Sequence, residues 1–238
     1  MSGYRRFFVD KALPQTIVGG EEFFHAVNVL RIREGDKIFL CDREGKEFVA
    51  EVEKIEKKSF TASVLEEHKN ECEPREKITL IAGYLKGDKT ELVVQKAVEL
   101  GVGKIIVFSS QFSSSYINEN KLLRLNKVAL EASKQCGRSK VPSVEYADSL
   151  EKALNFSAEA DNKLFACEFA DKNEVDFSKI SGSTAIVVGS EGGFSQEEFK
   201  LAQNLGYKTV YLGKRILRAE TACIALVAIC MNSLGEFN

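Results

Sequence analysis

The sequence predicts an α/β protein in two parts, a small N-terminal β-barrel and a larger C-terminal domain built on a parallel sheet. Short β-branched and aromatic runs fill residues 1–65, and a polar stretch with one proline follows over residues 66–76. After it, near-continuous apolar strands alternate with helices, which is typical of a parallel sheet covered on both faces. We therefore expect a barrel domain over residues 1–70 and an α/β domain over residues 74–238.

The N-terminal part is expected to hold four strands and one short helix. Glycine and aspartate residues separate the strands, and a helix is expected over residues 21–30. The expected strands cover residues 4–9, 37–41, 46–55 and 59–65.

The C-terminal part shows the alternation of a parallel α/β sheet. Helices are expected over residues 89–100 and 121–136, and a purely apolar run covers residues 222–231. The second helix carries an apolar stripe of Leu122, Leu125, Ala129, Ala132 and Cys136. The expected strands cover residues 78–83, 104–110, 163–168, 185–189 and 209–213.

Composition excludes several classes of protein. The chain has 238 residues, of which 44% are hydrophobic and 29% are charged, as in an ordinary folded protein. The longest apolar run has about half the length of a membrane span, and the N-terminus lacks a signal-peptide core, so we expect a cytoplasmic protein without membrane association. No C-x-x-C pair occurs and the two histidines lie far apart, so no metal site is expected.

The charge distribution is uneven along the chain. The net charge is −2, but residues 74–150 carry 12 basic and 8 acidic side chains, a local excess of +4. A polyanion is therefore compatible with one face of the protein.

Two glycine-rich loops follow neighbouring expected strands. They are GSEGGFS at 189–195 and LGKRILRAET at 212–221, and Cys167-Glu168 ends a third strand. Because ligands of open α/β sheets bind beyond the carboxyl ends of the strands, we expect the site there. The loops lack the lysine of a P-loop and the spacing of a dinucleotide fingerprint, which favours an adenosine ligand without phosphates. Ser195 and Glu198 match a capping box that starts the next helix.

Five motifs follow one another along the chain. They are HAVNVLRIREGD at 25–36, LKGDKTELVVQKAVELGV at 85–102, EASKQCGRSKVP at 131–142, GSEGGFS at 189–195 and LGKRILRAETA at 212–222. In this order they resemble the motifs of the RsmE family, SPOUT-superfamily methyltransferases that act on bacterial small-subunit ribosomal RNA. Ser190 stands where that family commonly has proline.

The resemblance implies a PUA-like RNA-binding barrel and a SPOUT domain with a deep trefoil knot. It also implies S-adenosyl-L-methionine as cofactor, a homodimer, and methylation of N3 of a specific uridine in 16S ribosomal RNA of the small ribosomal subunit. The residues expected to bind the cofactor are Cys167, Glu168, Val188, Gly189, Glu191, Gly192, Gly193, Leu212, Gly213, Ile216, Leu217, Arg218, Thr221 and Ala222.

Arg218 is the first candidate catalytic residue and Arg138 the second. Loss of the N3 proton leaves negative charge on the uracil oxygens, so a cationic donor is expected beside the base. Glu220 is expected either to fix Arg218 or to take the proton. The alternative for Arg218 and Glu220 is a capping pair at a helix start.

Candidate RNA-binding residues come from both parts of the chain. Glu131, Gln135 and Arg138 share one helix face if the helix extends that far, and the alternative is a solvated polar face. Lysines of the middle segment are expected at phosphates, against the alternative of ordinary surface charge. The full set is Arg5, Arg31, Lys86, Lys89, Lys96, Glu131, Gln135 and Arg138.

Two other functions remain open at this point. One is a methyltransferase of the same fold acting on another RNA, such as a transfer RNA ribose 2′-O enzyme. The other is a non-enzymatic RNA-binding ribosome assembly factor, which needs no adenosine pocket.

Overall fold

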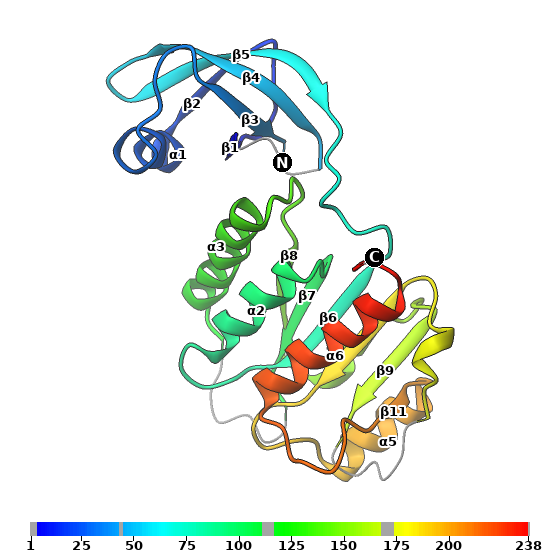
Figure 1. Ribbon diagram of the computed structural model, residues 1–238. Helices are drawn as coiled ribbons and strands as arrows, with labels where there is room; N and C mark the ends of the chain where they lie inside the picture. Colours follow the sequence, from blue (N-terminus) through cyan, green and yellow to red (C-terminus); the bar gives the residue numbers. More distant parts are fainter. Residues whose placement is uncertain (1–3, 43–44, 111–116, 168–173, 238) are drawn as a thin grey trace. The chain divides into compact units, whose positions relative to one another are not determined.

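The computed structural model describes residues 4–42, 45–110, 117–167 and 174–237. The chain forms two compact units, coloured along the sequence in Figure 1. The N-terminal unit contains Met1–Glu73 together with Ser133–Val141, and the C-terminal unit contains Pro74–Ala132 and Pro142–Asn238. Residues 133–141, which the sequence prediction placed in the C-terminal domain, thus belong to the N-terminal unit.

The N-terminal unit is a five-stranded sheet in the order β1-β3-β4-β5-β2. All neighbouring strands are antiparallel except β1 and β3. After β2 the chain turns through α1 (Gly20–Phe24) into the π-helical turn η1 (His25–Val29). The strands are β1 (Arg5–Phe8), β2 (Gln15–Gly19), β3 (Lys37–Cys41), β4 (Glu47–Ile55) and β5 (Ser59–His68).

The expected barrel is a curled sheet in the structure. In the described part, β1 and β2 each pair on one side only, so the sheet does not close. Two register shifts between β4 and β5, at Val49/Ala50 and Val52/Lys54, bend these long strands around the core. Phe7, Ile38 and Phe60 are buried in that core.

The C-terminal unit is a six-stranded parallel sheet in the order β11-β9-β10-β6-β7-β8. The predicted α/β class and its parallel sheet are thus confirmed. The strands are β6 (Ile78–Gly83), β7 (Lys104–Phe108), β8 (Ser143–Ala147), β9 (Asn162–Ala166), β10 (Thr184–Val188) and β11 (Lys208–Val210).

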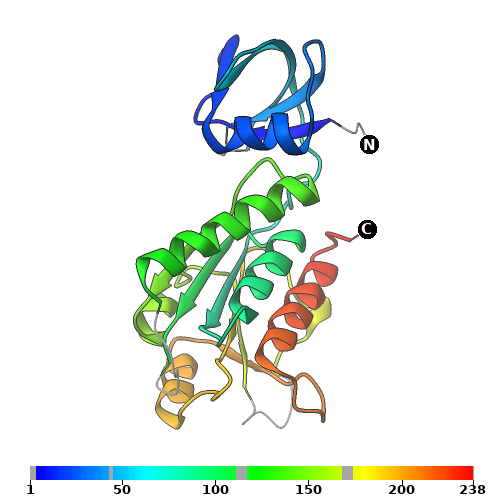
Figure 2. The same ribbon diagram turned by 90° about the vertical axis from the view of Figure 1, so that its left-hand side faces the viewer.

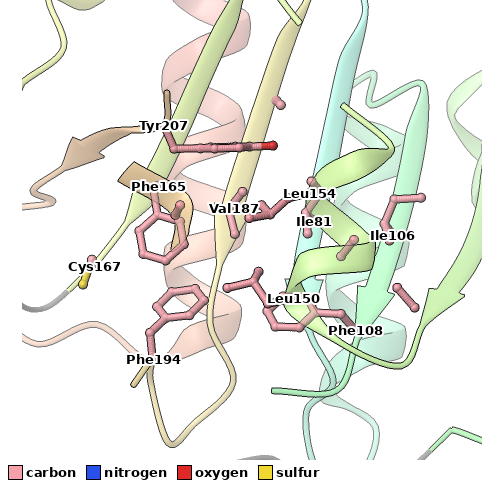
Figure 3. Packing of buried hydrophobic residues seen from close by; sticks show 14 residues of the cluster. Ile81, Ile106, Phe108, Leu150, Leu154, Phe165, Cys167, Val187, Phe194 and Tyr207 are labelled. Carbon is pink, nitrogen blue, oxygen red and sulfur yellow. The ribbon is translucent and has the colours of Figure 1, made fainter. Parts of the chain in front are cut away.

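Helices cover both faces of this sheet. Helices α2 and α6 lie side by side on one face with α3 beside α2, and α4 and α5 cover the other face (Figure 2). On that second face Phe165, Phe194, Val187 and Leu154 form a continuous apolar layer (Figure 3). The helices are α2 (Lys89–Glu99), α3 (Glu119–Cys136), α4 (Leu150–Asn155), the 3-10 turn η2 (Phe177–Lys179), α5 (Gln196–Asn204) and α6 (Ala219–Ser233).

The carboxyl ends of five strands are in register at one edge of the sheet. Val210 of β11 pairs with Ala166 of β9, which pairs with Val188 of β10. Val188 pairs with Ala82, and the next residue of β6, Gly83, pairs with Phe108 of β7. The loops that follow these strands therefore start from a common line. No helix in the described ranges combines the length and apolar character that a membrane crossing requires.

Candidate functional site

The loop after β10 approaches the end of β6 so closely that only glycine fits at position 83. A Cβ atom on Gly83 would lie 2.8 Å from the carbonyl carbon of Gly189 and closer still to the amide nitrogen of Ser190. Ser190 is buried and its hydroxyl shares a hydrogen bond of 3.0 Å with Ser110, beyond the end of β7. The loops of three strands are thus held together at the edge of the sheet.

Residues 190–193 form a tight turn. Gly193 donates its amide to the carbonyl of Ser190 at 3.0 Å and has a φ of +68°, which an L side chain rarely adopts. The turn exposes Glu191 and Gly192 at its tip. Its backbone amides and carbonyls are therefore open to direct contact with a ligand.

Aromatic packing and a helix cap fix the end of this loop. The ring of Phe194 lies 4.2 Å from that of Phe165, measured between ring centroids (Figure 3). Ser195 accepts from the amide of Glu198 and Glu198 accepts from the amide of Ser195, so the predicted capping box is confirmed.

Glu191 joins this loop to the lysine-rich segment after β6. Its carboxylate accepts from the backbone amide of Lys86 at 3.2 Å and from Nζ of Lys89 at 3.1 Å. Partial burial acts to raise the pKa of Glu191, but the hydrogen bonds from Lys89 and from backbone amides leave that pKa below its ordinary value. Glu191 therefore stays ionised and ties Lys89 to the loop.

Arg218 lies at the N-cap position of α6, where the loop after β11 ends. Its carbonyl accepts from the amide of Ala222, but its exposed side chain makes no capping hydrogen bond. In the described part of the chain, no hydrogen bond or ion pair joins the guanidinium of Arg218 to Glu220 or to any other group. The structure thus shows neither a capping pair nor a fixed arginine.

Glu220 carries an orphaned oxygen in the first turn of α6. Its Oε2 atom is buried and has no hydrogen-bond partner among the described residues. Burial raises the pKa of the neighbouring Cys223 thiol to about 12, and the charge of Glu220 adds to that shift. Because a buried, unpaired carboxylate oxygen is costly, this position suits a cationic or hydrogen-bond-donating group of a ligand.

The remaining cofactor candidates lie along the same edge. Cys167 and Val188 are buried at the ends of their strands, and Leu212 and Leu217 are half-buried in the loop after β11. Ala222 is buried in α6, whereas Thr221 and Ile216 are exposed. Glu168 lies outside the described residues.

Arg138 is paired with a carboxylate of its own unit. Helix α3 ends at Cys136 and Gly137 has a φ of +88°, so Arg138 does not continue the helix face of Glu131 and Gln135. The condition for one shared helical face, a helix that extends to Arg138, is therefore not met. Arg138 is buried, and its guanidinium donates to Oε2 of Glu73 at 3.0 and 3.1 Å.

The other polar candidates of the middle segment are more exposed. Glu131 and Gln135 point to solvent from α3, and the side chain of Lys86 is exposed. Lys96 is half-buried and pairs with Glu99 one turn further on at 2.8 Å. Lys89 and Lys96 thus each have a carboxylate partner, Glu191 and Glu99 respectively.

A basic groove of about 750 Å³ lies on the N-terminal unit. Arg31, one of the residues that line the groove, has a φ of +54°, an uncommon conformation outside glycine. The groove is lined by Tyr4, Arg5, Val29, Leu30, Arg31, Ile32, Arg33, Asp36, Lys37 and Ile38.

The four cations of this groove are uncompensated. Among the described residues, the side chains of Arg5, Arg31, Arg33 and Lys37 make no ion pair, and Asp36 accepts from the backbone amide of Arg33 instead. Sequence reasoning selected Arg5 and Arg31 but missed Arg33 and Lys37, and it also missed Gly83 and Ser110 in the other unit. The basic run R-I-R at 31–33 was the available signal for Arg33.

Two family models match the chain. The model of an RNA methyltransferase domain matches residues 71–231, and the model of an RNA methyltransferase PUA domain matches residues 18–65.

Named relatives match almost the whole chain. Two proteins named ribosomal RNA small subunit methyltransferase E are similar to it. That of Mesomycoplasma hyopneumoniae is 32% identical, and the match covers 95% of this chain and 98% of the relative. That of Bacillus subtilis is 33% identical, and the match covers 94% of this chain and 95% of the relative. A crystal structure of the enzyme of that name from Neisseria gonorrhoeae, bound to S-adenosyl methionine, matches with a TM-score of 0.88. It is 31% identical, and the match covers 99% of this chain and 100% of that one.

Proposed function

Because this chain belongs to the RNA methyltransferase family, together with ribosomal RNA small subunit methyltransferase E, we propose that it methylates N3 of a specific uridine in 16S ribosomal RNA. The chain is a methyltransferase that uses S-adenosylmethionine and acts on ribosomal RNA of the small subunit. The position of the methyl group on the base is the proposed part.

The observation that supports the proposal most directly is the edge of the parallel sheet. It brings a glycine turn, a second loop and the orphaned carboxylate oxygen of Glu220 to one line of strand ends. S-adenosylmethionine is an adenosine without phosphates that carries positive charge, so this chemistry fits it. When bound, it supplies an electrophilic methyl group.

We propose that residues at this edge of the sheet bind the cofactor. Backbone groups of the 189–193 turn and of the loop after β11 bind the adenosine. The complete proposed set is Cys167, Glu168, Val188, Gly189, Glu191, Gly192, Gly193, Leu212, Gly213, Ile216, Leu217, Arg218, Thr221 and Ala222.

Arg218 is the proposed catalytic cation. It donates hydrogen bonds to a uracil carbonyl oxygen, on which negative charge develops as N3 loses its proton. Glu220 is the proposed acceptor of that proton. Arg138 has its guanidinium occupied by Glu73, which favours Arg218 as the donor.

The basic groove of the N-terminal unit is the proposed RNA-backbone site. Phosphate contacts position RNA without reading its sequence, and four uncompensated cations suit that role. Lys86 and the exposed Glu131 and Gln135 complete the proposed RNA-binding set with Lys89, Lys96 and Arg138. Since its substrate belongs to the ribosome, the proposed location is the cytoplasm.

A homodimer is also proposed. Helix α6 is apolar around its whole circumference, and Leu226 and Cys230 are buried within their own unit. Ala225 and Ala228 remain half-buried and Ile229 is 38% exposed, so the helix offers a second apolar side to another copy.

Nucleoside analysis of ribosomal RNA tests the proposal. Deletion of the gene should remove one N3-methyluridine from 16S ribosomal RNA, and the purified protein with S-adenosylmethionine should restore it. Loss of a ribose-methylated nucleoside of transfer RNA would support the related 2′-O activity instead. Unchanged RNA together with no calorimetric binding of S-adenosylmethionine would indicate a non-enzymatic assembly factor.

A further inference from the structure

The loop between β11 and α6 presents an apolar side chain to solvent. Ile216 is 98% exposed, the largest value among the exposed large hydrophobic residues of the described chain. Lys214 and Arg215 precede it and are exposed as well. An isoleucine in this setting contributes nothing to the core of its own unit.

The cations around Ile216 lack partners. Among the described residues, the side chains of Lys214, Arg215 and Arg218 make no hydrogen bond or ion pair. Elsewhere in the same unit lysines pair with carboxylates, as Lys104 does with Glu145 at 2.8 Å. An apolar tip flanked by free cations is complementary to a nucleic acid, which offers phosphates beside base faces.

The loop lies at the edge where the chemistry is proposed. It follows β11, whose last residue is in register with the end of β9, and β9 in turn is in register with β10 and its glycine turn. Gly213, with a φ of +94°, turns the chain into the loop, and α6 begins at Ala219. Ile216 is therefore held at the midpoint of a short loop that is anchored at both ends.

The reaction sets a requirement that this loop meets. N3 lies on the edge of uracil that pairs with other bases, so the base must leave its stack and any pairing before transfer. Proteins that open a stack commonly insert an apolar side chain between base steps and grip the neighbouring phosphates with cations.

We propose that Ile216 is a wedge that occupies the stack vacated by the target uridine, while Lys214 and Arg215 bind the flanking phosphates. This inference rests on the proposed function and divides the role of Ile216. Its backbone belongs to the proposed cofactor site, and its exposed side chain acts toward RNA, so truncation of the side chain leaves the cofactor contact in place. A second copy of the chain would bring the same uncompensated cations to Ile216, whereas RNA supplies the anions that they lack.

The test uses full-length protein and small ribosomal subunits from cells that lack the enzyme. The variants are Ile216→Ala and the double variant K214Q/R215Q. Matched controls are Leu205→Ala and Lys208→Gln, an exposed leucine and an exposed lysine at the opposite end of β11. Four quantities are measured: single-turnover methylation at saturating subunits, subunit affinity against salt, calorimetric affinity for S-adenosylmethionine, and mass by light scattering.

We expect Ile216→Ala to slow single-turnover methylation at least about tenfold, because the wedge no longer offsets part of the free energy needed to extrude the base. Affinity for subunits and for S-adenosylmethionine, and the mass of the particle, should stay at wild-type values. The double variant should weaken subunit binding and reduce the slope of log affinity against log salt by about 1.4–1.8, since each lost phosphate contact removes about 0.7–0.9.

Three results would overturn the wedge. They are an unchanged single-turnover rate for Ile216→Ala, a slower rate that accompanies lost cofactor affinity, and a slower rate that accompanies a change in mass. If the wild-type protein itself transfers no methyl group to the subunits, the proposed function fails, and the wedge fails with it.

Discussion

Arg218 has a side chain that stabilises nothing within its own unit. If it stabilises charge on a uracil oxygen, Arg218→Ala should lower turnover about 10²–10³-fold, the loss typical of one removed oxyanion donor. Arg218→Lys should restore activity only in part, because an ammonium lacks the planar fork of a guanidinium. Single-turnover methylation and thermal melting check both statements. A lowered melting temperature with an unchanged rate would contradict the catalytic role and favour a structural one.

Gly83 allows the loop after β10 to approach the end of β6, at the edge of the sheet where the cofactor is proposed to bind. In Gly83→Ala the new methyl group collides with the backbone of Gly189 and Ser190, which cannot yield as a side chain would. We expect a loss of about 1–3 kcal/mol in unfolding free energy, as in other overpacked sites, together with weaker binding of S-adenosylmethionine.

Gly103→Ala is the matched control for Gly83→Ala. Its Cβ would meet only the carbonyl oxygen of Ile78 at an ordinary 3.7 Å, so it should bind the cofactor normally. Calorimetry and denaturant melts of both variants provide the measurement. Equal cofactor affinities for the two variants would show that the close approach at Gly83 is not needed for binding.

Residue-level prediction from the sequence worked where the signal was local. The capping box of Ser195 and Glu198 depends on two residues three apart, and both hydrogen bonds are present. The ion pair of Arg138, by contrast, is made with Glu73, which lies 65 positions away in the sequence. No local pattern contains such a partner.

At the level of elements, α6 keeps an apolar side with Ile229 exposed outside the core of its unit. Its outward apolar side is expected to bind a second copy, and Ile229→Asp should then shift the protein toward monomer by placing a charge in an apolar interface. Light scattering at micromolar concentration measures the shift. Leu226 belongs to the same apolar run but is fully buried, so a charge there would unfold the unit.

A control variant separates the interface from general destabilisation. Ala228 lies on the same helix and is half-buried, so Ala228→Ser should leave the mass unchanged because it adds one small hydroxyl group. A soluble Ile229→Asp dimer with wild-type mass would argue against an interface at this side of α6.

Elements that are long and periodic, or short and almost wholly apolar, were predictable. Helices α2 and α3 and strands β3 and β6 lie within two residues of their predicted ends. Strands β2 and β8 and helix α4 were missed. Each has five or six residues of mixed polarity, too few for a period to stand out, and β8 and α4 gain stability mainly by packing on neighbours far away in the sequence.

For the whole molecule, the sequence was enough to select a candidate site, because strand ends and glycine loops define it. The close approach of Gly83 to Ser190 and the groove of the N-terminal unit were not predictable, since both arise from segments that meet only after folding. Composition gave no indication of a basic groove in a unit that contains equal numbers of basic and acidic side chains.

The groove should dominate the salt dependence of RNA binding. Arg5→Ala and Arg31→Asn should each reduce the slope of log affinity against log salt by about 0.7–0.9. Asparagine is chosen at position 31 because it tolerates the positive φ found there. Filter binding to small ribosomal subunits measures the slopes, and Lys58→Ala, an exposed lysine outside the groove, should leave the slope unchanged.

The assignment of Ser133–Val141 to the N-terminal unit has a consequence for synthesis on the ribosome. The first 73 residues emerge before the segment that supplies Arg138 to Glu73, Ser139 to Gly45, and the carbonyl of Gly137 to Asn70. At a translation rate of about 5–20 residues per second, the N-terminal unit remains incomplete for roughly 3–14 s, until residues 133–141 have been synthesised. Nascent chains stalled just before residue 133 should therefore be cleaved by protease within the first 73 residues, and chains stalled well beyond residue 141 should resist.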